Sequence, residues 1–165
     1  MSNRLDFSRF RVVVVSGPQR SGTTIAARII ATESGMQYVD EDEYGTKDID
    51  AWKKLVATGQ NLVIHSPAMG RWVHEVSDPK AKGEDVAVVW LMRPLPEILA
   101  SQERIGWNDA NEREKYHMTP KDTRSIAFVK KWYWYSHQRP FICNAFELEY
   151  HSLKGHPLWV EADKR

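Results

Sequence analysis

The chain has 165 residues, of which 42% are hydrophobic and 11% aromatic, which is enough for a buried core. Its 23 lysines and arginines nearly balance 22 aspartates and glutamates, and the net charge of +1 argues against a general nucleic-acid binder, although it leaves room for a local basic patch. The single cysteine, Cys143, excludes an internal disulfide framework and a cysteine-based metal cluster.

No apolar run approaches the roughly 18 residues that span a bilayer, and the first residues do not have the pattern of a secretory signal. We therefore expect a single cytoplasmic domain over residues 1–165, without a membrane partner. The seven tryptophans are too many for a small core alone. We expect some of them to stack on a ligand or to mark a homodimer surface.

Apolar, β-branched runs alternate with segments of helical character along the chain. The predicted strands are residues 10–16, 36–39, 62–65, 86–92 and, more weakly, 145–150. The predicted helices are residues 23–33, 48–58, 70–77, 95–105 and 121–137. This alternation predicts an α/β fold, a doubly wound and mainly parallel sheet of about five strands with helices on both faces. Residues 106–120 form a long polar loop that suits a lid or a substrate loop.

The first predicted strand runs directly into a glycine-rich loop, and a helical segment follows. The loop consists of Gly17, Pro18, Gln19, Arg20, Ser21, Gly22, Thr23 and Thr24. Glycines allow close backbone approach, and the N–H groups at a helix start attract anions, so the loop predicts phosphate binding. Its spacing matches the P-loop pattern except that Thr23 occupies the lysine position. Arg20 is the basic residue of the loop.

Arg93 ends the fourth strand and predicts a second phosphate site. It lies where open α/β sheets bind ligands, and Ser101 follows about two helical turns later. A guanidinium and a hydroxyl together suit a phosphate. The alternative is an arginine that caps the strand and a serine on a solvated helix face.

The third strand ends at His65, which is followed by Ser66 and Pro67. A histidine beside a phosphate loop suits proton transfer near neutral pH. A histidine that caps the strand or bonds a backbone carbonyl explains the same position, and both interpretations stay open.

These stretches together resemble a known family. The loop Arg20–Thr24 resembles the 5′-phosphosulfate-binding loop of the sulfotransferases that use 3′-phosphoadenosine-5′-phosphosulfate. The stretch from Met92 to Gln102 is similar to the one in which bacterial members hold the 3′-phosphate with an arginine and a serine. His65, two residues before Pro67, is similar to the catalytic histidine of cytosolic members.

The resemblance implies a role for each matching residue. Arg20 would be catalytic and would contact the 5′-phosphate and the bridging oxygen, while His65 would take the proton of the acceptor. The other cofactor-binding residues would be Gly17, Ser21, Gly22, Thr23, Thr24, Arg93 and Ser101. Ile25 stands where many members place an adenine-stacking tryptophan, so Trp107 is a candidate for that platform.

The predicted function is therefore transfer of a sulfuryl group to a hydroxyl or amine of a small molecule or a modified biopolymer, without a metal. One alternative is a P-loop kinase that uses ATP and Mg²⁺, with Thr24 on the metal and Asp40 or Asp42 as the base. The acidic run 40–43 favours it, although it also suits a solvated loop and helix N-terminus, or the attraction of a cationic acceptor. Another alternative is a non-catalytic nucleotide-binding module, because residues after 153 show no further basic, glycine-containing loop.

Residues 128–139 mix basic and aromatic side chains in a way that can stack single-stranded nucleic acid. On a helix, however, Phe128, Trp132 and Tyr135 share one side. We therefore predict that this aromatic stripe packs in the core or at an interface.

Overall fold

In the part of the chain that the structure describes, parallel strands form one central sheet. This computed structural model describes residues 5–18, 20–81, 83–104 and 124–159. The strands are β1 (Val12–Ser16), β2 (Gln37–Val39), β3 (Leu62–His65), β4 (Val86–Met92) and β5 (Ala145–Glu149). They lie in the order β2-β3-β1-β4-β5, and each neighbouring pair is parallel. The predicted α/β doubly wound fold is confirmed.

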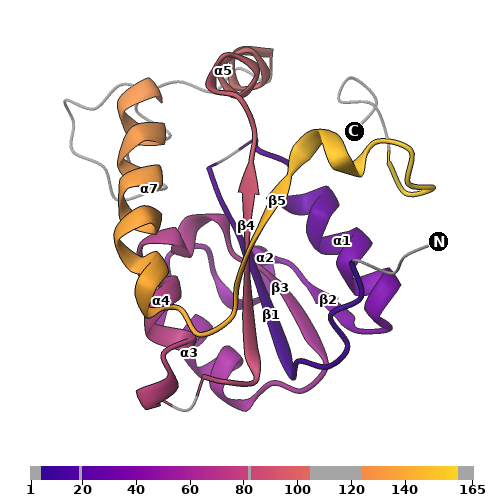
Figure 1. The fold of residues 1–165 in the computed structure, drawn as a ribbon, viewed down its shortest axis with the longest axis vertical. Coiled ribbons are helices and arrows are strands. Elements are labelled where there is room, and N and C mark those ends of the chain that lie inside the picture. The colour runs from indigo at the N-terminus through magenta and orange to yellow at the C-terminus, as the bar shows by residue number, and fades with distance from the viewer. Residues whose placement is uncertain (1–4, 19, 82, 105–123, 160–165) are drawn as a thin grey trace.

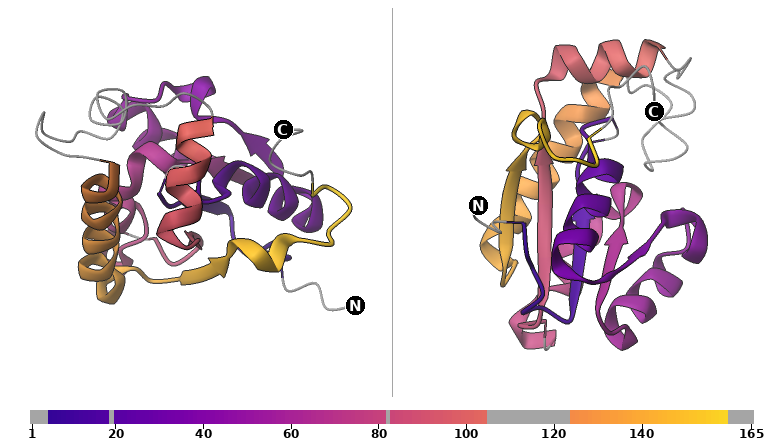
Figure 2. Two further views of the ribbon diagram at one scale, coloured as in Figure 1. Left: turned by 90° about the horizontal axis from the view of Figure 1, so that it is seen from above. Right: turned by 90° about the vertical axis from the view of Figure 1, so that its right-hand side faces the viewer.

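Helices cover both faces of the sheet. The α-helices are α1 (Thr23–Ser34), α2 (Glu41–Tyr44), α3 (Ile49–Thr58), α4 (Val73–Val76), α5 (Leu95–Arg104) and α7 (Arg124–Gln138). Short 3-10 turns are η1 (Pro67–Trp72), η2 (Pro79–Ala81), η3 (Arg139–Phe141) and η4 (Tyr150–Leu153). Figure 1 shows α1 on one side of the sheet and α3, α4 and α7 on the other, while α5 lies beyond the end of β4. The views in Figure 2 agree that α5 crosses over this end of the sheet.

The continuous apolar character of β1 follows from this two-sided cover. Val13 and Val15 face the α1 side, where they pack with buried residues such as Ile29. Val12 and Val14 face the opposite layer, which includes Trp52 of α3. All four valines are fully buried, as expected for a central parallel strand that must be apolar on both faces.

The acidic run after β2 lies at the start of a helix, in line with the helix N-terminus considered above, because it folds into the one-turn helix α2. Asp40 is its N-cap, and its carboxylate accepts from the Glu41 N–H at 2.7 Å. The Glu43 carboxylate in turn accepts from the Asp40 N–H at 2.7 Å. This capping box satisfies the exposed N–H groups of a helix start, and it leaves Glu41 buried.

Of the aromatic stripe predicted on α7, Tyr135 packs in the core, while Trp132 is partly exposed. Tyr135 is buried and stacks on Trp90, with ring centroids 4.4 Å apart and planes 10° apart. This contact sets the rotation of the helix about its axis. Lys131, four positions before Tyr135, and Gln138, three positions after it, therefore also face inward and are buried. Trp132 is 38% exposed as a result.

The long loop 106–120, predicted as a lid, and Trp107 within it lie outside the described residues. In the segments that are described, no helix combines the length and apolar character needed to cross a membrane.

Candidate functional site

The register of the sheet brings the strand ends together at one edge. Val15 pairs with His65, Ser16 with Trp90, Val39 with Ile64, and Met92 with Glu149. The carboxyl ends of all the strands therefore lie at the same level, where open α/β sheets bind ligands. The residues that follow the strands at this edge are Gly17, Asp40, Ser66, Arg93 and Tyr150.

The glycine-rich loop closes tightly on itself and presents the start of α1. Ser21 donates from both its N–H and its hydroxyl to the Pro18 carbonyl, at 3.1 and 2.5 Å. Gly22 is the N-cap of α1 at a φ of 95°, and it has no side chain with which to cap the helix. Among the described residues, no side chain caps the N–H groups of the first turn, and uncapped N–H groups of this kind suit an anion. Gln19 lies outside the described residues.

Arg20 adopts the left-handed backbone conformation, with a φ of 68°. Such a conformation is unfavourable for an arginine and is often found at functional sites. The Arg93 guanidinium holds it in place, since Nη1 donates to the Arg20 carbonyl at 2.8 Å. The strained turn directs the Arg20 side chain away from β3 and towards α5, where Nε donates to the Ser101 hydroxyl at 2.9 Å.

Basic side chains gather around the buried Ser101. Arg104 also donates to its hydroxyl, from Nη2 at 3.2 Å, so that Arg20 and Arg104 share one acceptor. Among the described residues, the buried Nε of Arg93 has no hydrogen-bond partner, and its nearest carboxylate oxygen, on Glu97, is 3.6 Å away. We call Arg20, Arg93, Arg104 and Ser101 the arginine cluster. It joins the two phosphate sites that the sequence predicts separately.

Glu97 only partly offsets this positive charge. A hydrogen bond from His151, together with the nearby charge of Arg93, holds the pKa of the Glu97 carboxyl below its ordinary value. Glu97 is therefore ionised at neutral pH, and it faces both Arg93 and His151.

Tyr150 contacts both the glycine-rich loop and Arg93. Its ring lies under the Arg93 guanidinium, 3.9 Å from the charge centre. A Cβ atom at Gly22 would lie 2.5 Å from the ring, so the loop fits against Tyr150 only with glycine at that position. Trp159 packs edge-on against the same ring at 5.0 Å. One aromatic ring thus sets the distance between the loop and the arginine.

His65 is buried between the loop and the end of β2. Its Nδ1 lies 3.2 Å from the Asp40 carboxylate, and its Nε2 lies 2.8 Å from the Thr23 hydroxyl and 3.3 Å from the Thr24 hydroxyl. Because a carboxylate only accepts, we assign the proton to Nδ1, which leaves the Nε2 lone pair facing the two threonines. This is the tautomer that a general base requires.

Two tyrosines enclose His65. Tyr44 donates from its hydroxyl to the His65 carbonyl at 2.7 Å, and the Tyr38 ring stacks over the imidazole at 6.5 Å. Burial, reinforced by the charge of Asp40, raises the pKa of Tyr38 to about 12. Burial likewise raises the pKa of Tyr44 above its ordinary value. Both phenols stay protonated at neutral pH, so neither can itself act as a base there.

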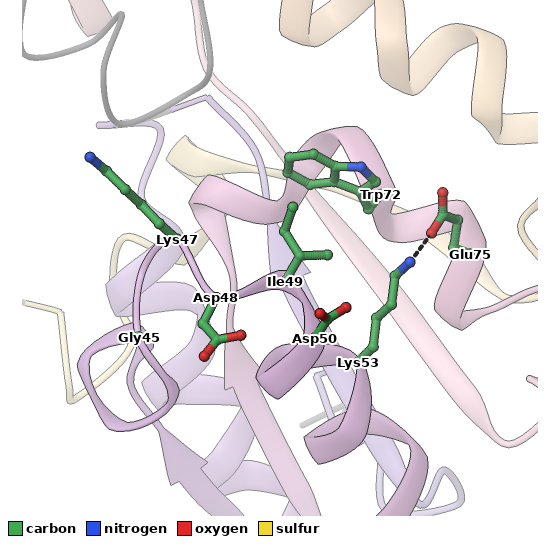
Figure 3. Close-up of a pocket in the computed structure, with 8 residues that line it drawn as sticks. All are labelled: Gly45, Lys47, Asp48, Ile49, Asp50, Lys53, Trp72 and Glu75. Atoms are coloured by element: carbon green, nitrogen blue, oxygen red, sulfur yellow. Dashed lines mark ion pairs between the residues drawn. The ribbon is translucent and has the colours of Figure 1, made fainter.

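A pocket of about 720 Å³ lies between the start of α3 and the η1–α4 segment. Figure 3 shows the Trp72 ring and Ile49 on its walls, with the Asp50 carboxylate nearby and Lys53 paired with Glu75. Gly45, which also lines it, directly follows Tyr44. The pocket thus begins next in sequence to Tyr44, while its lining does not include the residues that contact His65. Its lining is Gly45, Lys47, Asp48, Ile49, Asp50, Lys53, Trp72 and Glu75.

The structure brings most of the predicted site residues together. Thr23 and Thr24 contact His65, and Arg20 contacts Ser101. Arg93 donates to the Arg20 carbonyl, whereas Asp42 is exposed on α2. Within the segments that are described, no three His, Cys, Asp or Glu side chains are grouped to hold a metal ion.

Sequence reasoning missed three residues of the site, Arg104, Tyr150 and Lys131. Tyr150 could have been found, because it directly follows the fifth strand at the ligand-binding edge. Lys131 lies one turn before Tyr135, but the aromatic stripe predicted from the sequence places Trp132 rather than Lys131 on the packed side of α7.

Comparison of the chain with protein-family models and with the curated proteins gives no match.

Replacing Gly22 by alanine should destabilise the protein more than replacing Gly35. Both glycines have positive φ, 95° and 63°, and each substitution costs about 1–2 kcal/mol for the left-handed backbone. Only at Gly22 does the new methyl group meet Tyr150, whereas Gly35 has open space. We expect an additional loss of about 1–3 kcal/mol for Gly22→Ala from overpacking. Urea unfolding of both variants measures the difference, and equal losses would show that Tyr150 does not press on the loop.

Proposed function

We propose that the protein transfers a sulfuryl group from 3′-phosphoadenosine-5′-phosphosulfate to a hydroxyl or amine. The observation that carries this proposal is the arginine cluster, in which Arg20 connects the loop to Ser101 while Arg93 holds Arg20 in place. Two adjacent anion sites suit a nucleotide with phosphates on both the 3′ and the 5′ carbons of one ribose. A single-phosphate or triphosphate ligand does not need a second site in this place.

The residues present fit such a donor. The N–H groups of the loop and of the first turn of α1 suit the 5′-phosphate. The buried Arg93 Nε, which has no hydrogen-bond partner among the described residues, and the Ser101 hydroxyl suit the 3′-phosphate. Arg20 lies between these positions and would compensate charge on either side.

The chemistry assigned to the chain is positioning, charge compensation and proton transfer. The acceptor oxygen or nitrogen forms a bond to sulfur, and the bond from sulfur to the oxygen of the 5′-phosphate breaks, leaving its electron pair on that phosphate. Arg20 and the loop amides stabilise the negative charge that gathers there. His65 Nε2 takes the proton of the acceptor, and Asp40 stabilises the imidazolium that forms.

The pocket beside α3 is the proposed entry for the acceptor. Gly45, at its edge, directly follows Tyr44, whose hydroxyl donates to the His65 carbonyl. Trp72 and Ile49 offer an apolar wall, and the carboxylates of Asp48 and Asp50 suit a cationic amine.

A P-loop kinase is the second candidate, and a specific contact favours it. Asp40 and Thr24 lie on opposite sides of the His65 ring, so the proposed base and the proposed magnesium ligand of a kinase are both close to the loop. Thr23 at the lysine position argues against it, because the β- and γ-phosphates of ATP need a cation there.

Adenosine 3′,5′-bisphosphate should bind without a metal. We expect binding by calorimetry in EDTA, and a loss of about tenfold to a hundredfold in Arg93→Ala, because a hydrogen bond to a charged group contributes about 1.5–3 kcal/mol. Arg9→Ala is the matched control, since Arg9 is exposed before β1 and stacks on Phe10. ATP binding that requires Mg²⁺, with no binding of the bisphosphate, would favour the kinase instead.

Removing the imidazole should stop transfer without stopping binding. With donor labelled in the sulfuryl group and a panel of alcohols, amines and water as acceptors, we expect His65→Ala to lower transfer by about 10²–10⁴-fold, the usual contribution of a general base. The affinity for the bisphosphate should change little. His137→Ala, at an exposed position on α7, is the control. Full transfer by His65→Ala would remove His65 from the role of base.

A further inference from the structure

Lys131 is a buried lysine at the ligand-binding edge of the sheet. Only 3% of the residue is exposed. Its Nζ donates to the Pro67 carbonyl at 2.6 Å and lies 3.5 Å from the Gly17 carbonyl. Gly17 begins the phosphate loop, and Pro67 follows His65 by two residues. The ammonium group therefore lies between the first residue of the loop and the segment that follows the proposed base.

The helix holds this ammonium firmly in place. Tyr135 stacks on Trp90 one turn further along α7, and the Gln138 amide donates to the Arg71 carbonyl at 2.8 Å. Figure 1 shows that α7 packs on the face of the sheet opposite α1. Lys131 thus reaches the edge from the side that the loop helix does not cover.

A buried ammonium is costly to desolvate, so its position calls for an explanation. The loop has no lysine of its own, because Thr23 stands at that position. Its arginine, Arg20, is directed towards Ser101 on α5. The side of the loop that faces β3, where His65 lies, receives its positive charge from Lys131 instead.

We propose that Lys131 contacts the group being transferred and compensates its negative charge, in place of the lysine that the loop lacks. This assignment rests on the proposed function. The three N–H donors of an ammonium can exchange a carbonyl partner for an oxygen of the sulfuryl group. Such a contact involves only the donor that still carries the group, because the bisphosphate product no longer has it.

The test compares two nucleotides that differ only in this group. Calorimetry in acceptor-free buffer measures the affinity of Lys131→Met for 3′-phosphoadenosine-5′-phosphosulfate and for adenosine 3′,5′-bisphosphate. We expect the phosphosulfate to bind at least about tenfold more weakly than to the wild type, and the bisphosphate to change by less than about threefold. Lys130→Met is the matched control at the neighbouring position of α7. Lys131→Gln, which keeps a donor for Pro67, carries the same expectation should the methionine variant unfold.

Two results would overturn the assignment while leaving the proposed function intact. Equal weakening of both nucleotides would mean that Lys131 only supports the loop, and unchanged affinity for both would mean that it contacts neither. If the wild type binds neither nucleotide, the proposed function itself fails, and the assignment of Lys131 fails with it.

Discussion

The hydrogen bonds that join the ends of β1 and β3 determine where every other part of the site lies. The Ser16 hydroxyl donates to the Ser66 carbonyl at 2.8 Å, and the Trp52 indole donates to the Ser66 hydroxyl at 2.9 Å. All three residues are fully buried. They hold the loop after β1 beside the histidine at the end of β3, while the parallel register brings Asp40 and Arg93 to the same level. The position of each site residue then follows from the strand that precedes it.

The near-zero net charge of the chain conceals an uneven distribution. Positive charge gathers on two sides of the glycine-rich loop, with Arg20, Arg93 and Arg104 towards α5 and Lys131 towards β3. The arginine contacts are partly buried and those of Lys131 are buried, so the proposed anion would meet charges that are already held in position. Preorganised charge of this kind is usually the largest contribution to group transfer. The opposing carboxylates, Asp40 and Glu97, are each bonded to a histidine.

Much of this arrangement could be predicted from the sequence. The valine run of β1 indicates a central parallel strand, and the spacing of Gly17 and Gly22 indicates the loop. The positions of His65 and Arg93 could be predicted because each ends or follows a strand, and the carboxyl ends of all strands in a parallel sheet lie at the same edge. These predictions succeed because they depend on strand periodicity and chain order, which are local properties.

The features of the site that could not be predicted from the sequence depend on tertiary contacts. The rotation of α7 is set by the stacking of Tyr135 on Trp90. Without knowledge of that contact, the sequence suggests that Lys131 is an exposed lysine, although it is buried. The orientation of Arg20 depends on its left-handed backbone and on Arg93, which lies far away in the sequence. Tyr150 joins the loop to Arg93 through packing alone. Neither composition nor spacing shows any of these contacts.

The central claim is that two phosphate sites lie side by side, and it is tested most directly by removing one phosphate from the ligand. Calorimetry of the wild type in EDTA should compare adenosine 3′,5′-bisphosphate with adenosine 5′-monophosphate. Arg93 and Ser101 would lose their ligand in the monophosphate, so we expect its affinity to be lower by about tenfold to a hundredfold. Equal affinities for the two nucleotides would contradict the account, because the arginine cluster would then play no part in recognition.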